Sequence, residues 1–169
     1  MLADIDSLHT VGRLDMETEG LLLLTTNGKF TANVHARCRK KYWVLVEGSP
    51  EPSAIETMRA GGLKIRGAVT RPPVALRILP DQDRAFRVLP LAAPGMDRMG
   101  RDGTATWLEI VLDEGRNRQV RRITKHAGHR VIRLCRVAVG GIEFPANMEL
   151  KPGEWKPFEK DSVFSEEGN

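Results

Sequence analysis

The chain has 169 residues, 41% of them hydrophobic and 28% charged, which is the composition of an ordinary globular protein that can bury a core. Its apolar runs are far shorter than the roughly 18 residues of a membrane span. Its start, MLADIDSLHT, is mixed and acidic, so we expect neither a membrane protein nor a secretory signal. Two cysteines, Cys38 and Cys135, make no disulfide framework, which favours a cytoplasmic location.

The positive charge of the chain is concentrated in one segment. Residues 116–136 hold eight Lys and Arg residues and no Asp or Glu, and removing these eight charges from the net +4 leaves −4 for the remainder. A mildly acidic protein with one cationic element is suited to a polyanionic partner, RNA or DNA. The alternative is a solvated basic helix face without a partner.

From the start of the chain, the hydrophobic pattern predicts a short strand running into a turn, a buried strand, a helix and an alternating strand, over residues 9–15, 20–26, 29–37 and 42–48. The buried strand contains the four leucines of 21–24, a run typical of a strand that is covered on both faces. In the alternating strand, Tyr42, Val44 and Val46 share the face opposite Trp43.

A helix is expected within residues 49–62. Ser49 would be its N-cap, Ile55 and Met58 its buried face, and Gly61-Gly62 its end. Four more segments read as strands, two of them separated by a Pro-Pro break: 63–69, 74–79, 106–112 and 131–144. In the third of these, the inward residues would be Leu108, Ile110 and Leu112.

Residues 80–103 lose all periodicity and gather Pro, Gly, Asp and Arg, so we expect a long loop or insertion there. A second helix would begin after Asn117 as its N-cap and end at Gly128, with an apolar stripe of Val120, Ile123 and Ala127. Runs of strands with few helices between them predict an α+β fold, built on a mixed, mostly antiparallel β-sheet with flanking helices.

Three carboxylates stand at alternate positions before the leucines: Asp15, Glu17 and Glu19. A carboxylate where a loop enters a buried strand is partly desolvated and stays ionised only beside a cation, which the 116–136 segment could supply. Such a group could attack or deprotonate a nucleotide, although a turn aspartate is the commoner role. Two of the three could also form a glycosidase-like pair, but no aromatic sugar platform accompanies them.

Two further features allow more than one interpretation. His35 with Cys38, and His126 with His129, have the spacing of zinc ligands, although both pairs lie in basic segments. Tyr42 is the only tyrosine, and an aromatic residue at a strand start beside basic residues either packs in the core or stacks on a base.

Three stretches taken together resemble the motifs of the RsuA-like family of ribosomal RNA pseudouridine synthases: VGRLDMETEGLLLLTTNG, KKYWVLVEG and EGRNRQVRRITKHAGHRVIRLCRVAVGGI. The resemblance covers about residues 10–155 and keeps the motifs in the family's order. It implies a curved, mostly antiparallel sheet crossed by a catalytic cleft. It also implies conversion of a uridine in ribosomal RNA to pseudouridine, without a metal or any other cofactor.

The resemblance also implies roles for particular residues. Asp15 of G-R-L-D matches the catalytic aspartate, and Tyr42 matches the tyrosine that packs on the base and assists at C5. Arg121 of R-Q-V-R matches the arginine that pairs with the aspartate, and Leu134 matches the apolar residue that closes the pocket. Further contacts to the RNA are expected from Arg13, Arg116, Arg118, Gln119, Arg122, Lys125 and Arg136.

The chain departs from the family pattern at its N-terminus. An S4 RNA-binding domain and an N-K-P-x-G-like motif are typical there, and neither is in this sequence. The T-x-x-W-L-E-I and G-E-W segments are most similar to the S4-lacking branch that modifies large-subunit ribosomal RNA. We expect a monomeric catalytic domain over 1–158 and a flexible tail over 159–169. A non-catalytic RNA-binding protein that uses the basic segment is the alternative.

Overall fold

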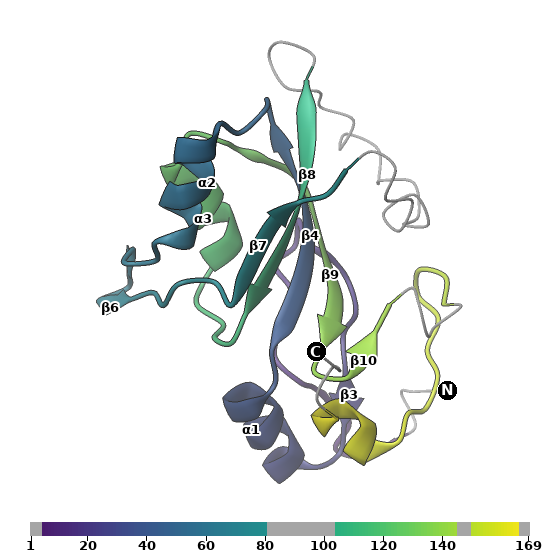
Figure 1. The fold of residues 1–169 in the computed structure, drawn as a ribbon. Helices are drawn as coiled ribbons and strands as arrows, with labels where there is room; N and C mark the ends of the chain where they lie inside the picture. Colours follow the sequence, from purple (N-terminus) through teal and green to yellow (C-terminus); the bar gives the residue numbers. More distant parts are fainter. Residues whose placement is uncertain (1–4, 81–103, 145–149, 166–169) are drawn as a thin grey trace.

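The computed structural model describes residues 5–80, 104–144 and 150–165 (Figure 1). Its helices are α1 (Gly28–Arg37), α2 (Pro52–Arg59), α3 (Gln119–His126) and the 3₁₀ helix η3 (Lys160–Phe164). Its strands are β1 (His9–Thr10), β2 (Glu19–Gly20), β3 (Leu24–Thr25), β4 (Lys40–Glu47), β5 (Lys64–Ile65), β6 (Ala68–Val69), β7 (Ala75–Ile78), β8 (Ala105–Leu112), β9 (Val131–Val139) and β10 (Ile142–Glu143). The loop expected over 80–103 lies almost wholly outside the described residues.

The main sheet is built around the two long strands β4 and β9. Its order is β10-β9-β4-β8-β7, and all of these pairs are antiparallel. Strand β2 joins β9 in parallel, while β1 pairs with β3 and β5 with β6 in two small separate sheets. The fold is therefore α+β with a mixed, mostly antiparallel sheet, and the predicted fold class is confirmed.

The two faces of the sheet carry separate parts of the core. Val44 and Val46 of β4 point to the face that α2 and α3 cover side by side (Figure 1) and are completely buried there. Trp43 points to the opposite face, where it packs in a second cluster with Val137. The alternation predicted for β4 is therefore confirmed, and so are the inward residues of β8 and the apolar stripe of α3.

The pairing of β4 with β9 is irregular at one point that matters for the site. Lys41 lies opposite Ala138, but the next residue, Tyr42, lies opposite Arg136, so Val137 is passed over. A β-bulge of this kind re-aims side chains locally and increases the twist of the strands. Here it places the only tyrosine of the chain directly across from Arg136.

The leucine run does not form the predicted strand. Gly20 has φ +108°, the chain stays hydrogen-bonded to β9 as far as Leu21, and the register with β1 includes only Leu24 and Thr25. Within the run only Leu23 is buried, and Leu22 is 37% exposed. The run is split because its backbone serves two different partners in succession, so the expectation of a strand covered on both faces is wrong.

Three local predictions also fail for identifiable reasons. The segment 63–69 is not one strand but the hairpin β5–β6, because Arg66 and Gly67 both have positive φ and form a tight turn. The N-cap of α2 is Glu51 rather than Ser49. The N-cap of α3 is Arg118 rather than Asn117, since Arg118 takes the left-handed conformation there.

The described part of the expected tail, residues 159–165, belongs to the fold. Val163 of η3 is fully buried, and its carbonyl oxygen accepts hydrogen bonds from the N–H of Gly141 at 3.0 Å and the thiol of Cys38 at 3.6 Å. The prediction of a flexible tail is therefore wrong for these residues. None of the helices in the described ranges is long and apolar enough to cross a lipid bilayer.

Glu114 holds the loop between β8 and α3. Its nearly buried carboxylate accepts hydrogen bonds from the Arg71 backbone N–H at 2.8 Å, the Gln119 side chain at 2.7 Å and Arg116 Nε at 3.0 Å. Burial alone would raise the pKa of Glu114, but these hydrogen bonds and the charge of Arg116 outweigh it and hold the pKa below its ordinary value. The loop that leads into the cationic helix is thus fixed by one carboxylate.

We predict that Glu114→Gln lowers the free energy of unfolding at neutral pH by about 1–2 kcal/mol, since charge-assisted hydrogen bonds are lost. Because the folded-state pKa of Glu114 is depressed, its contribution is present above the ordinary glutamate pKa and disappears as the pH falls through the folded value. Urea unfolding at a series of pH values should show the two proteins converging in acid. Glu56→Gln, at an exposed site, is the control, and a pH-independent difference would contradict the assignment.

The docking of η3 predicts a large difference between two glycine substitutions. Gly140 and Gly153 both have positive φ, so alanine at either position costs roughly 1 kcal/mol in backbone strain. Only at Gly140 would the new Cβ also collide with the Val163 carbonyl oxygen, whereas nothing lies near Gly153. Gly140→Ala should therefore lower the free energy of unfolding by at least about 2 kcal/mol more than Gly153→Ala. Equal losses would show that η3 is not packed as described.

Candidate active site

A cavity of about 350 Å³ opens between the N-terminal turn, the start of β4, the middle of β9 and the loop before α3. It is lined by Asp15, Tyr42 and Leu134, three of the four residues expected to carry the chemistry. Its wall also holds five of the residues expected to contact RNA: Arg13, Arg116, Arg118, Gln119 and Arg136. Its volume is within the range of small-ligand sites.

Asp15 lies in a tight turn at the edge of this cavity. Its carbonyl oxygen accepts a hydrogen bond from the Thr18 N–H at 2.8 Å, and its side chain is 29% exposed. The nearest cation is Arg118, whose Nη1 lies 3.8 Å from Asp15 Oδ2. The left-handed backbone of Arg118, with φ +52°, sets this residue at the beginning of α3, facing the turn.

Arg121, the expected ion-pair partner of Asp15, binds the turn instead. Its Nη2 donates to the Glu17 carbonyl at 2.6 Å and to Thr18 Oγ1 at 3.5 Å, while its Nε lies 3.8 Å from the Glu17 carboxylate. Burial lowers the pKa of Arg121, and the charges of Glu17 and Asp15 act in the opposite direction. The expected contact with Asp15 is therefore made not by Arg121 but by Arg118 in this structure.

The other two carboxylates of the acidic segment have structural partners. Glu17 is 60% exposed and bonds to Arg118 at 2.7 Å, and that hydrogen bond lowers the pKa of Glu17. Glu19 pairs with Arg133 through both carboxylate oxygens. Of the three acids only Asp15 lines the cavity, so the structure gives no support to a glycosidase-like pair.

Tyr42 reaches the cavity from the start of β4. It packs against the core cluster under α2 and α3, and its cross-strand partner in β9 is Arg136. Burial and, to a smaller extent, the charge of Asp15 raise the pKa of Tyr42. The nearby guanidinium of Arg136 lowers the pKa of Tyr42. The net pKa lies above the ordinary value, so Tyr42 is both a core aromatic and a wall of the site.

Sequence reasoning missed three basic residues of the cavity wall: His35, Lys40 and Arg66. Lys40 is only 7% exposed, its Nζ donates to the His35 carbonyl at 3.5 Å, and burial lowers its pKa. Its position two residues before Tyr42 in an alternating strand was an available signal, because both then share a face. Arg66 comes from the β5–β6 turn, which the sequence pattern did not reveal.

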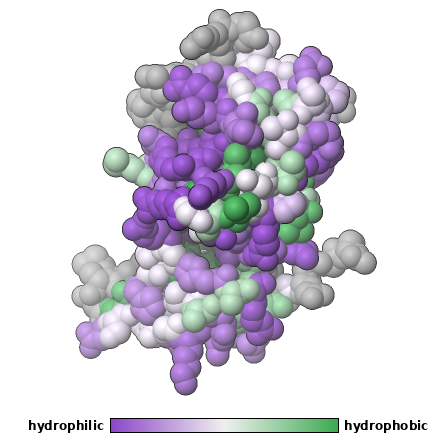
Figure 2. Space-filling model, turned by 90° about the vertical axis from the view of Figure 1, so that its left-hand side faces the viewer, coloured by the Kyte–Doolittle hydropathy of each residue, from purple (hydrophilic) through white to green (hydrophobic). Residues whose placement is uncertain are grey.

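The basic segment divides into inward and outward cations. Arg122, Lys125 and Arg130 are exposed, whereas Arg136 is 6% exposed and Arg133 is engaged with Glu19. We had expected Arg136 to contact RNA, but it is buried and lines the cavity instead of lying on the surface. Figure 2 looks onto the side with α2, α3 and β6 and shows a mostly hydrophilic face interrupted by a smaller apolar area.

The two pairs considered as zinc ligands do not assemble. Cys38 donates to the Val163 carbonyl, and His129 is hydrogen-bonded to the Glu47 carbonyl at 2.8 Å. Among the described residues no group of three or more His, Cys, Asp or Glu could hold a metal ion.

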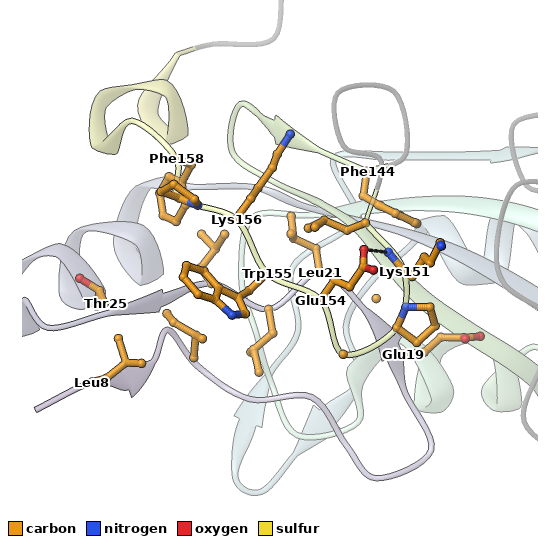
Figure 3. A pocket seen from close by; sticks show the side chains of 18 of the residues that line it. Leu8, Glu19, Leu21, Thr25, Phe144, Lys151, Glu154, Trp155, Lys156 and Phe158 are labelled. Atoms are coloured by element: carbon orange, nitrogen blue, oxygen red, sulfur yellow. Dashed lines mark hydrogen bonds between the residues drawn. The ribbon is translucent and has the colours of Figure 1, made fainter. Parts of the chain in front are cut away.

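A larger and mainly apolar cavity of about 710 Å³ lies beside the leucine run (Figure 3). Its walls come from the run, from Phe30 of α1 and from residues 150–158, including Trp155, which is 54% exposed. Its acids have structural partners: Glu19 binds Arg133, and Glu154 accepts from the Lys151 N–H at 2.9 Å. Asp15 and Tyr42 line the smaller cavity and not this one.

The arrangement agrees with what the chain is similar to. Residues 3–126 match the RNA pseudouridylate synthase family. The chain is 36% identical over 155 residues to ribosomal large subunit pseudouridine synthase E of Vibrio vulnificus, covering 90% of this chain and 62% of that protein. It is 37% identical over 153 residues to the enzyme of the same name from Xanthomonas campestris, covering 88% of this chain and 76% of that protein.

A crystal structure of a pseudouridylate synthase superimposes with a TM-score of 0.70 at 25% identity, over 93% of this chain and 58% of that one. The chain thus spans about three fifths of the length of two of these proteins and three quarters of the third. The match over most of the sequence, the shared fold and a cavity lined by an aspartate and a tyrosine lead to one conclusion. The chain belongs to the RNA pseudouridylate synthase family.

Proposed function

We propose that the chain isomerises a uridine of large-subunit ribosomal RNA to pseudouridine, with Asp15 as the catalytic carboxylate. The observation that carries this proposal is the cavity in which Asp15, Tyr42 and Leu134 meet from three separate parts of the chain. The names of the Vibrio and Xanthomonas relatives support the choice of large-subunit RNA as substrate.

The reaction breaks one bond and forms another without net gain or loss of atoms. The N1–C1′ glycosidic bond of uridine breaks, the detached uracil turns, and C5 bonds to C1′. The proton on C5 leaves, and N1 takes up a proton. No electrons are exchanged with a cofactor, so the site needs an anion at the ribose, a surface that holds the free base and an acceptor for the C5 proton.

The cavity residues fit these needs. Asp15, at the cavity edge, acts at the ribose, either as the nucleophile on C1′ or as the base that removes a ribose proton. Tyr42 and Leu134 give the base an apolar wall, and the Tyr42 hydroxyl accepts the proton from C5. Arg121 contributes by holding the Glu17–Thr18 turn, which keeps Asp15 at the cavity.

A uridine can reach Asp15 only if it is extruded from the RNA structure, which costs unstacking energy. Binding of the surrounding phosphates must offset that cost. Arg122, Lys125 and Arg130 are exposed on the same basic segment whose first residues line the cavity. We propose that they hold the strand on either side of the extruded uridine, together with Arg118.

Asp15→Asn is expected to lower the rate of pseudouridine formation by at least about 100-fold, because the amide can neither attack nor accept a proton. The substitution is nearly isosteric, so the affinity for RNA should change less than about twofold. Tritium release from C5-labelled RNA measures the rate, and filter binding measures the affinity. Asp161→Asn, at an exposed position of η3, is the matched control. Undiminished activity of Asp15→Asn would exclude Asp15 as the catalytic carboxylate.

The exposed cations predict a steep dependence of RNA binding on salt. Four phosphate contacts, from Arg118, Arg122, Lys125 and Arg130, correspond to a log–log slope of roughly −3 to −4. Arg122→Ala or Lys125→Ala should flatten the slope by about 0.7–0.9 and weaken binding to all RNA sequences alike. Lys29→Ala, exposed on α1, is the control. A slope near zero would show that α3 does not hold the RNA.

A further inference from the structure

Arg136 is a buried cation whose role the proposed function does not explain. Its side chain is 6% exposed in the middle of β9, and within the described ranges no carboxylate forms an ion pair with it. Burying a charge without an opposite charge is costly unless hydrogen bonds replace the lost water. The groups that Arg136 contacts should therefore indicate why an arginine stands there.

The contacts of Arg136 join two parts of the cavity. Its Nε donates to the Leu21 carbonyl at 2.9 Å, and its own carbonyl accepts from the Leu21 N–H at 2.8 Å. In the register of β4 and β9, Arg136 lies directly opposite Tyr42, and its guanidinium lowers the pKa of the Tyr42 hydroxyl. The remaining Nη2 is buried and finds no hydrogen-bond partner within the described part of the chain. One side chain thus binds the segment after Asp15 and lies across the sheet from the tyrosine.

The backbone places Arg136 for this contact. Without the bulge in β9, Tyr42 would lie opposite Val137. A valine side chain could neither donate a hydrogen bond to a phenol oxygen nor stabilise negative charge on it. With the bulge, Tyr42 and Arg136 are direct cross-strand partners and line the same cavity. Cross-strand partners have Cβ atoms about 5 Å apart, close enough for a guanidinium to meet a phenol.

We propose that Arg136 is a positioning residue for Tyr42: it holds the phenol oxygen toward the base and stabilises negative charge on it, so that Tyr42 can accept the proton from C5. The proton moves from C5 to the phenolate oxygen while the electrons of the C–H bond return to the pyrimidine ring. Tyr42 then releases this proton to solvent. The role of Tyr42 as proton acceptor rests on the proposed function, whereas the positioning of Tyr42 by Arg136 does not.

The charges around Tyr42 define the direction of the effect. A cation favours the phenolate, so Arg136 lowers the pKa of Tyr42 against the stronger effect of burial, and Asp15 opposes Arg136. The other titratable or charged groups of the cavity wall are Arg13, His35, Lys40, Arg66, Arg116 and Arg118. Removing the charge of Arg136 should therefore move the Tyr42 titration upward.

The experiment uses the fact that Tyr42 is the only tyrosine of the chain. Its ionisation can be followed by phenolate absorbance in the full chain, with Tyr42→Phe as the blank. We expect Arg136→Gln, which keeps a donor but not the charge, to shift the midpoint to higher pH. The titration midpoint of Tyr42 in Arg136→Lys should lie near that of the wild type. In Arg130→Gln, a substitution at an exposed position, the midpoint should equal that of the wild type. An unmoved midpoint in folded Arg136→Gln overturns the proposal.

The same variants separate this inference from the proposed function. If the chain isomerises uridine, the alkaline shift of Arg136→Gln should appear in the pH profile of single-turnover rates, and Arg136→Lys should restore the profile. If wild-type chain forms no pseudouridine although the absorbance midpoint shifts, the proposed function fails and the hold on Tyr42 stands. A shifted titration with an unshifted rate profile overturns the role of Tyr42 as acceptor.

If Arg136→Gln does not fold, the contact between Arg136 and Tyr42 can be tested by NMR, which measures how fast the guanidinium protons of Arg136 exchange with water. A hydrogen bond to the phenol oxygen slows their exchange with water, and Tyr42→Phe removes only that oxygen. We expect faster exchange in Tyr42→Phe than in the wild type. Equal exchange rates would overturn the contact.

Discussion

The pairing of β4 with β9 is the interaction on which the rest of the structure depends. These two strands form the middle of the sheet, and the residues of β4 alternate between the core under α2 and α3 and the core on the other face. The register shift after Lys41 brings Tyr42 opposite Arg136. Strand β2 is held in parallel against the same part of β9, which brings the Asp15 turn to the cavity. One strand pair therefore serves both stability and the site.

Charged side chains of the basic segment hold the acidic turn that carries Asp15. The Asp15–Thr18 turn leaves Met16 fully exposed, and Arg118 and Arg121, at the start of α3, bind it through Glu17 and Thr18. The basic segment thus has three uses along its length: it fixes an acidic turn, it presents exposed cations to solvent, and it buries one cation against the tyrosine. This explains why the positive charge of the chain is concentrated there rather than spread over the surface.

Sequence reasoning succeeded where a single periodicity decides the structure. Residues 42–48 and 106–112 alternate as expected, and α3 buries its predicted stripe, because burial of one face requires these patterns. It failed where the backbone serves two partners, as at the leucines, or where a turn needs positive φ in a residue other than glycine, as at Arg66 and Arg118. The residues of the site were predicted from the resemblance to a known family. The contact between Arg118 and Asp15 was not predicted, because it depends on the left-handed backbone of Arg118 at the start of α3.

Our central proposal is that the cavity at Asp15 converts a uridine to pseudouridine. It is tested most directly by incubating the purified chain with ribosomal RNA transcribed in vitro, which contains no pseudouridine, and mapping pseudouridine at single-nucleotide resolution. We expect a new pseudouridine at a defined position of large-subunit RNA with the chain and none without it. Transcripts that bind the chain and remain free of pseudouridine would contradict the claim.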